Sequence, residues 1–424
     1  MIPMWVPVAL FALMYALLLL LPERRWIVSP SVAALFLLLG ILTPGNALRA
    51  VNWNVLLMLG GTMVTVSLFV ESRMPLRMAE ELLRAAPSVQ WAAVALCLFA
   101  GVISAFVDNV ATVLMFAPVG LAVAKRIGTD PVPLIISIAV SSNLQGAATL
   151  VGDTTSILLG GSLGMGFNDF FRFRGKPGIF FAVEAGALLT VPILLFLFRK
   201  EKGRINVEEC TSVEDPIPAV LLVSTVVLLI AASLFPDKPE MTNGILCCAV
   251  AAVGIAYEAI RRKTARVIKD GIRAIDWKTL VLLSGLFVVI EGLTEAGVID
   301  AAAGLFVKVG GRSPALMYCL IVSVSVVFSA FIDNIPYVAA MLPVTAGIAS
   351  MLESEPYLFA FGLLIGATLG GNITPVGASA NIAGIGILQK EGYPVPTKAF
   401  LRIGVPFTLT AAVSGAAIIW LIWR

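Results

Sequence analysis

The sequence predicts an all-α polytopic membrane protein made of two inverted repeats, and three observations lead to this fold class. Hydrophobic residues fill 59% of the 424 positions and charged residues only 13%, and the mean hydropathy is +0.98. Because soluble proteins carry roughly 25% charged residues, the surface of this chain is suited to lipid. The other two observations are apolar runs near the ~20 residues that cross a bilayer and an internal repeat.

The internal repeat contains polar residues as well as apolar ones. Residues 104–119 (SAFVDNVATVLMFAPV) match residues 329–344 (SAFIDNIPYVAAMLPV), a shift of 225 positions. At the same shift and without a gap, residues 145–157 (QGAATLVGDTTSI) fall on residues 370–382 (GGNITPVGASANI). Collinear matches that include charged and amide side chains indicate duplication rather than a shared apolar composition.

The repeat divides the chain into a first repeat (1–198), a cytoplasmic linker (199–216) and a second repeat (217–424). Each repeat is expected to contain five crossings plus one re-entrant hairpin around its Asp-Asn motif, and one of the five crossings is interrupted. The two interrupted helices are 132–165 and 357–388. The full set of predicted segments is 4–21, 27–43, 53–70, 89–124, 132–165 and 178–198, followed by 217–235, 242–260, 277–295, 314–352, 357–388 and 400–423.

Positive charge predicts the orientation. If each hairpin returns to its own side, 21 of the 29 Lys and Arg residues share one side, which is then the cytoplasm. Both termini fall on the extracytoplasmic side, and in a prokaryote the protein is expected in the inner (plasma) membrane. An odd number of crossings inverts the second repeat relative to the first. Inverted repeats with interrupted helices form the midplane sites of secondary transporters.

The Asp-Asn motifs are the first candidate site. Asp108 and Asp333 lie in apolar surroundings, and each is followed by an asparagine, Asn109 or Asn334. An ionised carboxylate at the centre of the bilayer costs roughly 3 kcal/mol on insertion scales, so it must bind a cation, take a proton or face water. At the tip of a hairpin, the ends of two half-helices would favour ions. The alternative is a structural role, in which the aspartate caps the following helix.

The interrupted helices supply the second candidate site, because glycine, threonine and one proline fall where a helix should continue. Unwinding there would free carbonyl oxygens that suit a small hard cation such as sodium. The alternative is a hinge of small residues that allows close helix packing. The oxygen-bearing side chains of these segments are Thr149, Asp153, Thr154 and Ser156 in the first repeat and Thr374, Ser379 and Asn381 in the second.

The motifs SAFVDNVATV, SAFIDNIPYV, LVGDTTSI and GGNITPVGASANI resemble the ArsB/NhaD permease family of the ion transporter superfamily. This family includes arsenite efflux permeases, sodium/proton antiporters and the melanosomal P protein. GDTTS resembles the antiporter and arsenite members, whereas the hairpins resemble the P-protein group. The resemblance implies a mobile transport domain of hairpins and broken helices, a scaffold of the remaining helices, a homodimer and elevator-like movement.

The resemblance also implies two ion sites by position. One would be lined by Asp108, Asn109, Thr112, Thr149 and Asp153, and the other by Asp333, Asn334, Thr374, Ser379 and Asn381. Sodium, if it is the coupling ion, would bind at Asp108, Asn109, Asp153, Asp333 and Asn334.

We therefore expect a cation-coupled secondary active transporter. The leading form is an antiporter that exchanges protons for sodium or drives efflux of an arsenite-like solute, because the intramembrane acids have no clustered intramembrane base. The alternative is a sodium- or proton-coupled symporter of a carboxylate or sulfate. The expected partners are the small solute, the bilayer and a second copy of the chain, and no cofactor is expected beyond a coupling sodium ion.

Two other classes of function lack support in the sequence. A net charge of +3 without a basic stripe gives no support for nucleic-acid binding. An enzyme is not expected, because the chain has no histidine and no phosphate loop or nucleophile motif.

Overall fold

The computed structural model describes residues 3–201, 203, 211–213, 215–235 and 238–424, so residues 202, 204–210 and 214 of the predicted linker lie outside the described part. The helices of the first half are α1 (Trp5–Leu20), α2 (Arg25–Leu38), α3 (Pro44–Ala50), α4 (Trp53–Glu71), α5 (Met74–Ala85), α6 (Val89–Ser104), α7 (Asn109–Ile127), α8 (Val132–Gly146), α9 (Thr154–Leu163) and α10 (Ile179–Leu197). Those of the second half are α11 (Ile217–Ala232), α12 (Thr242–Arg261), α13 (Arg266–Ala274), α14 (Trp277–Glu295), α15 (Val298–Gly310), α16 (Pro314–Ser329), α17 (Asn334–Met351), α18 (Tyr357–Gly370), α19 (Ser379–Lys390) and α20 (Thr397–Trp423).

The helical fold predicted from composition is confirmed. The described chain adds two 3-10 helices, η1 (Pro22–Arg24) and η2 (Phe167–Phe170), and one small antiparallel ribbon of β1 (Arg172–Phe173) and β2 (Lys176–Pro177), which the sequence did not predict. Seven of the described helices are long and apolar enough to cross a membrane, or up to nine if each of two bent pairs counts as one span. The chain is therefore an integral membrane protein.

The two bent pairs differ from straight crossings. Helices α1 and α2 meet at 116° across η1, and α15 and α16 meet at 113°. The predicted crossing 27–43 is shorter than expected, because α2 ends at Leu38 and is about 21 Å long at 1.5 Å per residue. The turn between α1 and α2 is important for the site, because Arg25 is the first residue of α2.

Helices α8 and α18 form the centre of the molecule. Nearly every residue of α8 and every residue of α18 is buried. Helix α6 packs on α8 and α16 packs on α18, while α20 contacts both central helices. Because both faces of these central helices contact protein, their polar side chains are withdrawn from lipid and can line or support a site.

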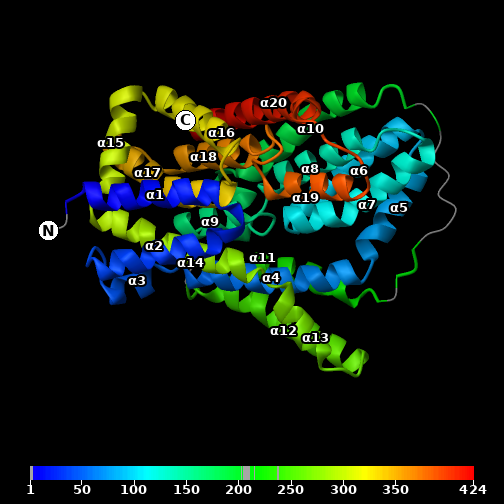
Figure 1. Ribbon diagram of the computed structural model, residues 1–424, viewed down its shortest axis with the longest axis horizontal. Helices are drawn as coiled ribbons and strands as arrows, with labels where there is room; N and C mark the ends of the chain where they lie inside the picture. Colours follow the sequence, from blue (N-terminus) through cyan, green and yellow to red (C-terminus); the bar gives the residue numbers. More distant parts are fainter. Residues whose placement is uncertain (1–2, 202, 204–210, 214, 236–237) are drawn as a thin grey trace.

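The two halves interlock at the shorter helices that follow the breaks. Helix α9 of the first half packs against α17 and α18 of the second, and α19 packs against α7 and α8 of the first. In Figure 1, α9 and α17 lie toward the end of the molecule that holds the N-terminus, whereas α7 and α19 lie toward the opposite end. Each half therefore contributes one short helix to the other.

Two close helix pairs lie beside this central group, α4 with α12 and α2 with α14. A glycine makes each contact possible. A Cβ added to Gly61 would lie 2.5 Å from the backbone of Cys247, and one added to Gly285 would lie 2.6 Å from the backbone nitrogen of Pro30. Small residues that let backbones approach in this way are typical of packed membrane helices.

Candidate functional site

Both aspartates of the Asp-Asn motifs cap the helix that follows them. Asp108 Oδ1 accepts hydrogen bonds from the amides of Val110 (2.9 Å) and Ala111 (3.1 Å) at the start of α7. Asp333 Oδ1 accepts one from the amide of Ile335 (3.2 Å) at the start of α17. The capping alternative is therefore present in the structure. Capping occupies only one oxygen of each carboxylate.

The asparagines hold the two tips in place. Ser104 donates to Asn109 Oδ1 at 3.0 Å, and Ser329 donates to Asn334 Oδ1 at 2.7 Å. Asn109 Nδ2 in turn donates to Asn143 Oδ1 at 3.0 Å on α8. Because these side chains are buried and bonded, the amide oxygens of both asparagines are committed to the protein.

The predicted interruptions are confirmed at both positions. Helix α8 ends at Gly146 and α9 begins at Thr154, while α18 ends at Gly370 and α19 begins at Ser379. Hydroxyl groups hold the unwound segments against the tips, since Thr149 donates to the carbonyl of Ala105 and Thr374 to the carbonyl of Ala330. These two bonds are equivalent under the internal repeat.

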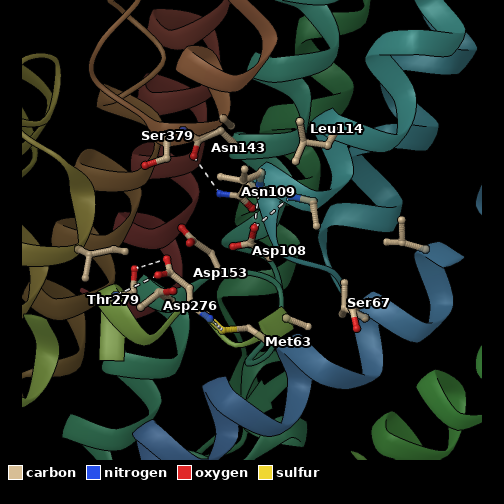
Figure 2. Close-up of a pocket in the computed structure, with 18 of the residues that line it drawn as sticks. Met63, Ser67, Asp108, Asn109, Leu114, Asn143, Asp153, Asp276, Thr279 and Ser379 are labelled. Carbon is tan, nitrogen blue, oxygen red and sulfur yellow. Dashed lines mark hydrogen bonds between the residues drawn. The ribbon is translucent and has the colours of Figure 1, made fainter. Parts of the chain in front are cut away.

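The charged and polar side chains of the site line one cavity of about 550 Å³. It lies where both tips, both interrupted segments, α4 and the start of α14 meet. Its polar lining consists of Ser67, Glu71, Asp108, Asn109, Asn143, Asp153, Thr154, Asp276, Thr279, Asp333, Asn334 and Ser379. Figure 2 shows the side chains of Asp108, Asp153 and Asp276 directed into the same space.

Acidic groups dominate the electrostatics of this cavity. Asp153, which is 8% exposed, lies close enough to Asp108 and Asp333 for electrostatic interaction, and Asp108 interacts in the same way with Asp276. The hydroxyl of Thr155 donates to Asp153 Oδ2 at 2.8 Å. Carboxylates this close repel each other in a poorly screened interior, so the cavity favours a cation or protons.

The structure divides the twelve predicted site residues into two groups. Seven line the cavity, and they are Asp108, Asn109, Asp153, Thr154, Asp333, Asn334 and Ser379. The other five bond to nearby backbone carbonyls and lie outside the lining, and they are Thr112, Thr149, Ser156, Thr374 and Asn381. The aspartates of the two predicted ion sites therefore meet in one cavity.

Sequence reasoning missed several residues of the site. Asn143 is an amide inside an apolar helix, a signal that was visible in the sequence. Asp276 precedes α14 and bonds to Thr279 at 2.6 Å, but a helix cap next to a basic loop does not by itself indicate a cavity.

The expectation that the intramembrane acids have no base beside them was wrong. Arg25 Nη1 lies 2.9 Å from Asp333 Oδ2. The bend between α1 and α2 brings this arginine to the site, and the sequence alone placed it in a loop between two crossings.

Comparison with known proteins finds transporters among the relatives of this chain. A protein of Mycobacterium tuberculosis (strain ATCC 25618 / H37Rv) called uncharacterized transporter Rv2685 is 30% identical over 380 residues, covering 88% of this chain and 86% of that protein. The human P protein is 26% identical over 496 residues, covering 96% of this chain and 58% of that protein.

Two solved structures share the fold. The YdaH transporter of Alcanivorax borkumensis superposes with a TM-score of 0.61 at 14% identity, covering 89% of this chain and 86% of that chain. MtrF of Neisseria gonorrhoeae, described as one of a class of antimetabolite efflux pumps, gives a TM-score of 0.57 at 16% identity, covering 87% and 80%. At these identities the likeness shows the fold alone. The family model described as citrate transporter (CitMHS) matches residues 5–366, and the chain therefore belongs to this family of membrane transporters.

Proposed function

We propose that this chain is a cation-coupled secondary active transporter that uses the acidic cavity of Asp108, Asp153 and Asp333 to couple cation movement to transport. The observation that supports this most directly is the convergence of carboxylates from both halves on one cavity of about 550 Å³. Removing several carboxylates from water is unfavourable unless a cation or proton neutralises them. Binding of the coupling ion therefore neutralises and stabilises the acidic cavity.

Antiport is the leading form of this proposal. The aspartates of the cavity can exchange protons for sodium at one site, because a carboxylate binds either ion but not both. Efflux of an arsenite-like solute driven by protons would use the same groups. The resemblance to ArsB/NhaD permeases, including the GDTTS motif at 152–156, supports antiport over uptake.

A carboxylate symporter is the second candidate, because the matching family is described as citrate transporter. In this form the acidic groups bind sodium or protons, and the bound cations hold the anion. The guanidinium of Arg25 beside the cavity would also suit a substrate carboxylate, since Arg–carboxylate pairs form strong charge-assisted hydrogen bonds.

Proteoliposomes distinguish the two forms. The purified protein is reconstituted with a pH-sensitive dye inside, and sodium, lithium, potassium or arsenite is added in turn. A proton flux that sodium or lithium triggers, and that Asp153→Asn abolishes, supports antiport. Sodium-dependent uptake of labelled citrate without such a flux supports symport. Asp130→Asn is the matched control, because Asp130 is exposed, accepts a hydrogen bond from the amide of Val132 at the start of α8, and does not line the cavity.

The cation-binding proposal itself has a sharper test. Both forms require the negative charge of this cavity. Asp108→Asn removes a cation ligand, and Asp333→Asn leaves the positive charge of Arg25 unpaired beside the site, so vesicles with either variant should lose coupled flux. Flux equal to wild type in both variants would reject the proposal whichever substrate is moved.

The mechanism we propose is an elevator movement of inverted repeats. The equivalent bonds from Thr149 and Thr374, and the placement of α7 and α17 toward opposite ends in Figure 1, support inversion. In this arrangement the tips and broken helices move against α2, α4, α12 and α14. A homodimer with both termini outside the cytoplasm belongs to the same proposal, and thiol labelling of cysteines added at the termini of right-side-out vesicles tests the sidedness.

A cross-link between α4 and α9 tests the movement. A Cβ added to Gly161 would lie 2.7 Å from Val55 Cγ2, so the double variant Val55→Cys/Gly161→Cys should form a disulfide in this state. Transport should stop on oxidation and return on reduction, whereas each single variant should be indifferent to oxidant. Full transport with the disulfide formed would exclude movement between these helices.

A further inference from the structure

Arg25 is held at the turn between α1 and α2 by two contacts. Its Nη1 lies 2.9 Å from Asp333 Oδ2, and its Nε donates to the carbonyl of Leu18 at 3.0 Å. The α1 helix is itself tied to the tip of α17, because the hydroxyl of Tyr15 donates to the carbonyl of Pro336 at 2.6 Å. These contacts therefore fix the orientation of the guanidinium toward Asp333.

Asp333 and Asp108, which are equivalent under the internal repeat, differ in whether a basic side chain pairs with them. Asp333 Oδ2 accepts from Arg25 and also from Ser379 Oγ at 3.3 Å. Within the described parts of the chain, the carboxylate of Asp108 accepts hydrogen bonds only from the amides of Val110 and Ala111, and no lysine or arginine pairs with it. One tip thus has a resident positive charge, and the other does not.

A guanidinium in this place is equivalent to a permanently bound monovalent cation. Arginine cannot be deprotonated in proteins, so its charge does not leave by titration. The pair is largely withdrawn from solvent, with side-chain exposures of 23% and 16%, and is poorly screened there. Asp333 is consequently neutralised in the empty cavity, whereas Asp108 and Asp153 still require an external cation.

We propose that Arg25 is a built-in cation that fills the Asp333 side of the cavity, so that the chain binds its coupling cation only between Asp108 and Asp153. This inference deepens the proposed function and rests on it for the identity of the bound ion as a coupling ion. It assigns Arg25 the role of setting how many cations accompany each transport event.

The test counts sodium ions bound to purified full-length protein at pH 8, using radioactive sodium and equilibrium dialysis. Arg25→Gln should bind one more sodium ion per chain than wild type, and Asp333→Asn in the same chain should remove the gain. Arg25→Lys keeps the charge and should bind as wild type does. Arg24→Gln is the matched control, because Arg24 is the exposed neighbour in the same turn and loses the same charge without freeing Asp333.

The difference between variant and wild type decides this inference, and the wild-type count bears on the proposed function. One ion in wild type and one in Arg25→Gln would overturn the inference and leave cation coupling intact. No sodium ion bound to wild type and one bound to Arg25→Gln would support Arg25 as a built-in cation but would count against sodium as the coupling ion. Arg25→Met is a second variant that removes the charge. If Arg25→Gln and Arg25→Met both elute as folded protein and neither binds more sodium than wild type, the role of Arg25 as a built-in cation is rejected. Two sodium ions bound to wild type would reject it as well.

Discussion

Thr155 and Thr368 place their hydroxyl oxygens 3.1 Å apart, although they come from different halves of the chain. Each hydroxyl has one proton to donate, and Thr155 uses its proton on Asp153, so Thr368 is the donor between them. Thr368 of α18, Thr155 of α9 and the Asp153 carboxylate of the cavity therefore form a chain of two hydrogen bonds, which we call the threonine relay.

Removing this relay at Thr155 should weaken cation binding. A hydrogen bond to a charged group contributes about 1.5–3 kcal/mol, so Thr155→Val should raise the sodium concentration for half-maximal transport by about ten- to a hundredfold. Thr368→Val removes the second hydroxyl without touching Asp153 and should have a smaller effect. Equal effects of the two substitutions on transport kinetics would argue against a direct role for the Thr155–Asp153 bond.

Gly152 and Gly377 occupy equivalent tight places beside the two tips. A Cβ would lie 2.5 Å from the carbonyl oxygen of Gly146 in one case and 2.5 Å from that of Gly371 in the other. Gly152→Ala and Gly377→Ala should each destabilise the protein by about 1–3 kcal/mol, the usual range for overpacking. Thermal unfolding in detergent measures this. Gly386→Ala, where a Cβ meets nothing within 4 Å, should keep the wild-type midpoint or raise it.

Asn143 makes three hydrogen bonds, and two of them join the two halves. Its Nδ2 donates to the carbonyl of Thr368 at 2.8 Å and to Asn372 Oδ1 at 3.0 Å, while its Oδ1 accepts from Asn109. Asn143→Leu strands these buried partners, each at a cost of about 1–3 kcal/mol, so the protein should unfold at lower temperature and lose transport. Ser137→Ala, in the same buried helix, is the control. Its hydroxyl has no partner in the described chain, and its removal should change the unfolding temperature little.

Glu258 is a buried acid in a charged cluster at the end of α12. Its carboxylate lies 3.0 Å from Arg261 Nη2 and 2.6 Å from Arg262 Nε, and its side chain is 2% exposed. Both arginines are partly exposed, so Glu258→Gln should cost about 2 kcal/mol after screening. Glu81→Gln breaks the exposed pair with Arg77 and should cost much less. Similar losses of thermal stability in the two variants would contradict the expectation that the buried ion pairs of Glu258 contribute more to stability than the exposed pair of Glu81.

The positions of the breaks and tips could be predicted from the sequence because a polar residue within an apolar run is costly and therefore informative. Asp108, Asp153 and Asp333 all reach the cavity as candidate ligands. The direction of a neutral side chain is harder to infer. Thr149 and Thr154 both looked like ligands, yet one bonds to a backbone carbonyl and the other lines the cavity. Their spacing within an unwound segment does not encode which way each points.

The ion pair between Arg25 and Asp333 shows a different limit. The two residues are separated by 308 positions, and their contact depends on a 116° bend between α1 and α2. Hydropathy indicates that both helices are apolar, but two short apolar helices are compatible with two crossings or with one bent pair. Arg25 therefore looked like a loop charge that reports orientation, whereas its side chain reaches the acid of the distant tip.

The exchange of α9 and α19 between the halves has a consequence for biosynthesis. When the ribosome has made only the first half, α9 has neither α17 nor α18 to cover it, and Asp153 at its start has only part of its final surroundings. The nascent chain must keep this acidic segment from lipid until residues beyond 334 have been inserted. A gene truncated between the halves would therefore yield an open intermediate that quality-control proteases can recognise, rather than a smaller carrier.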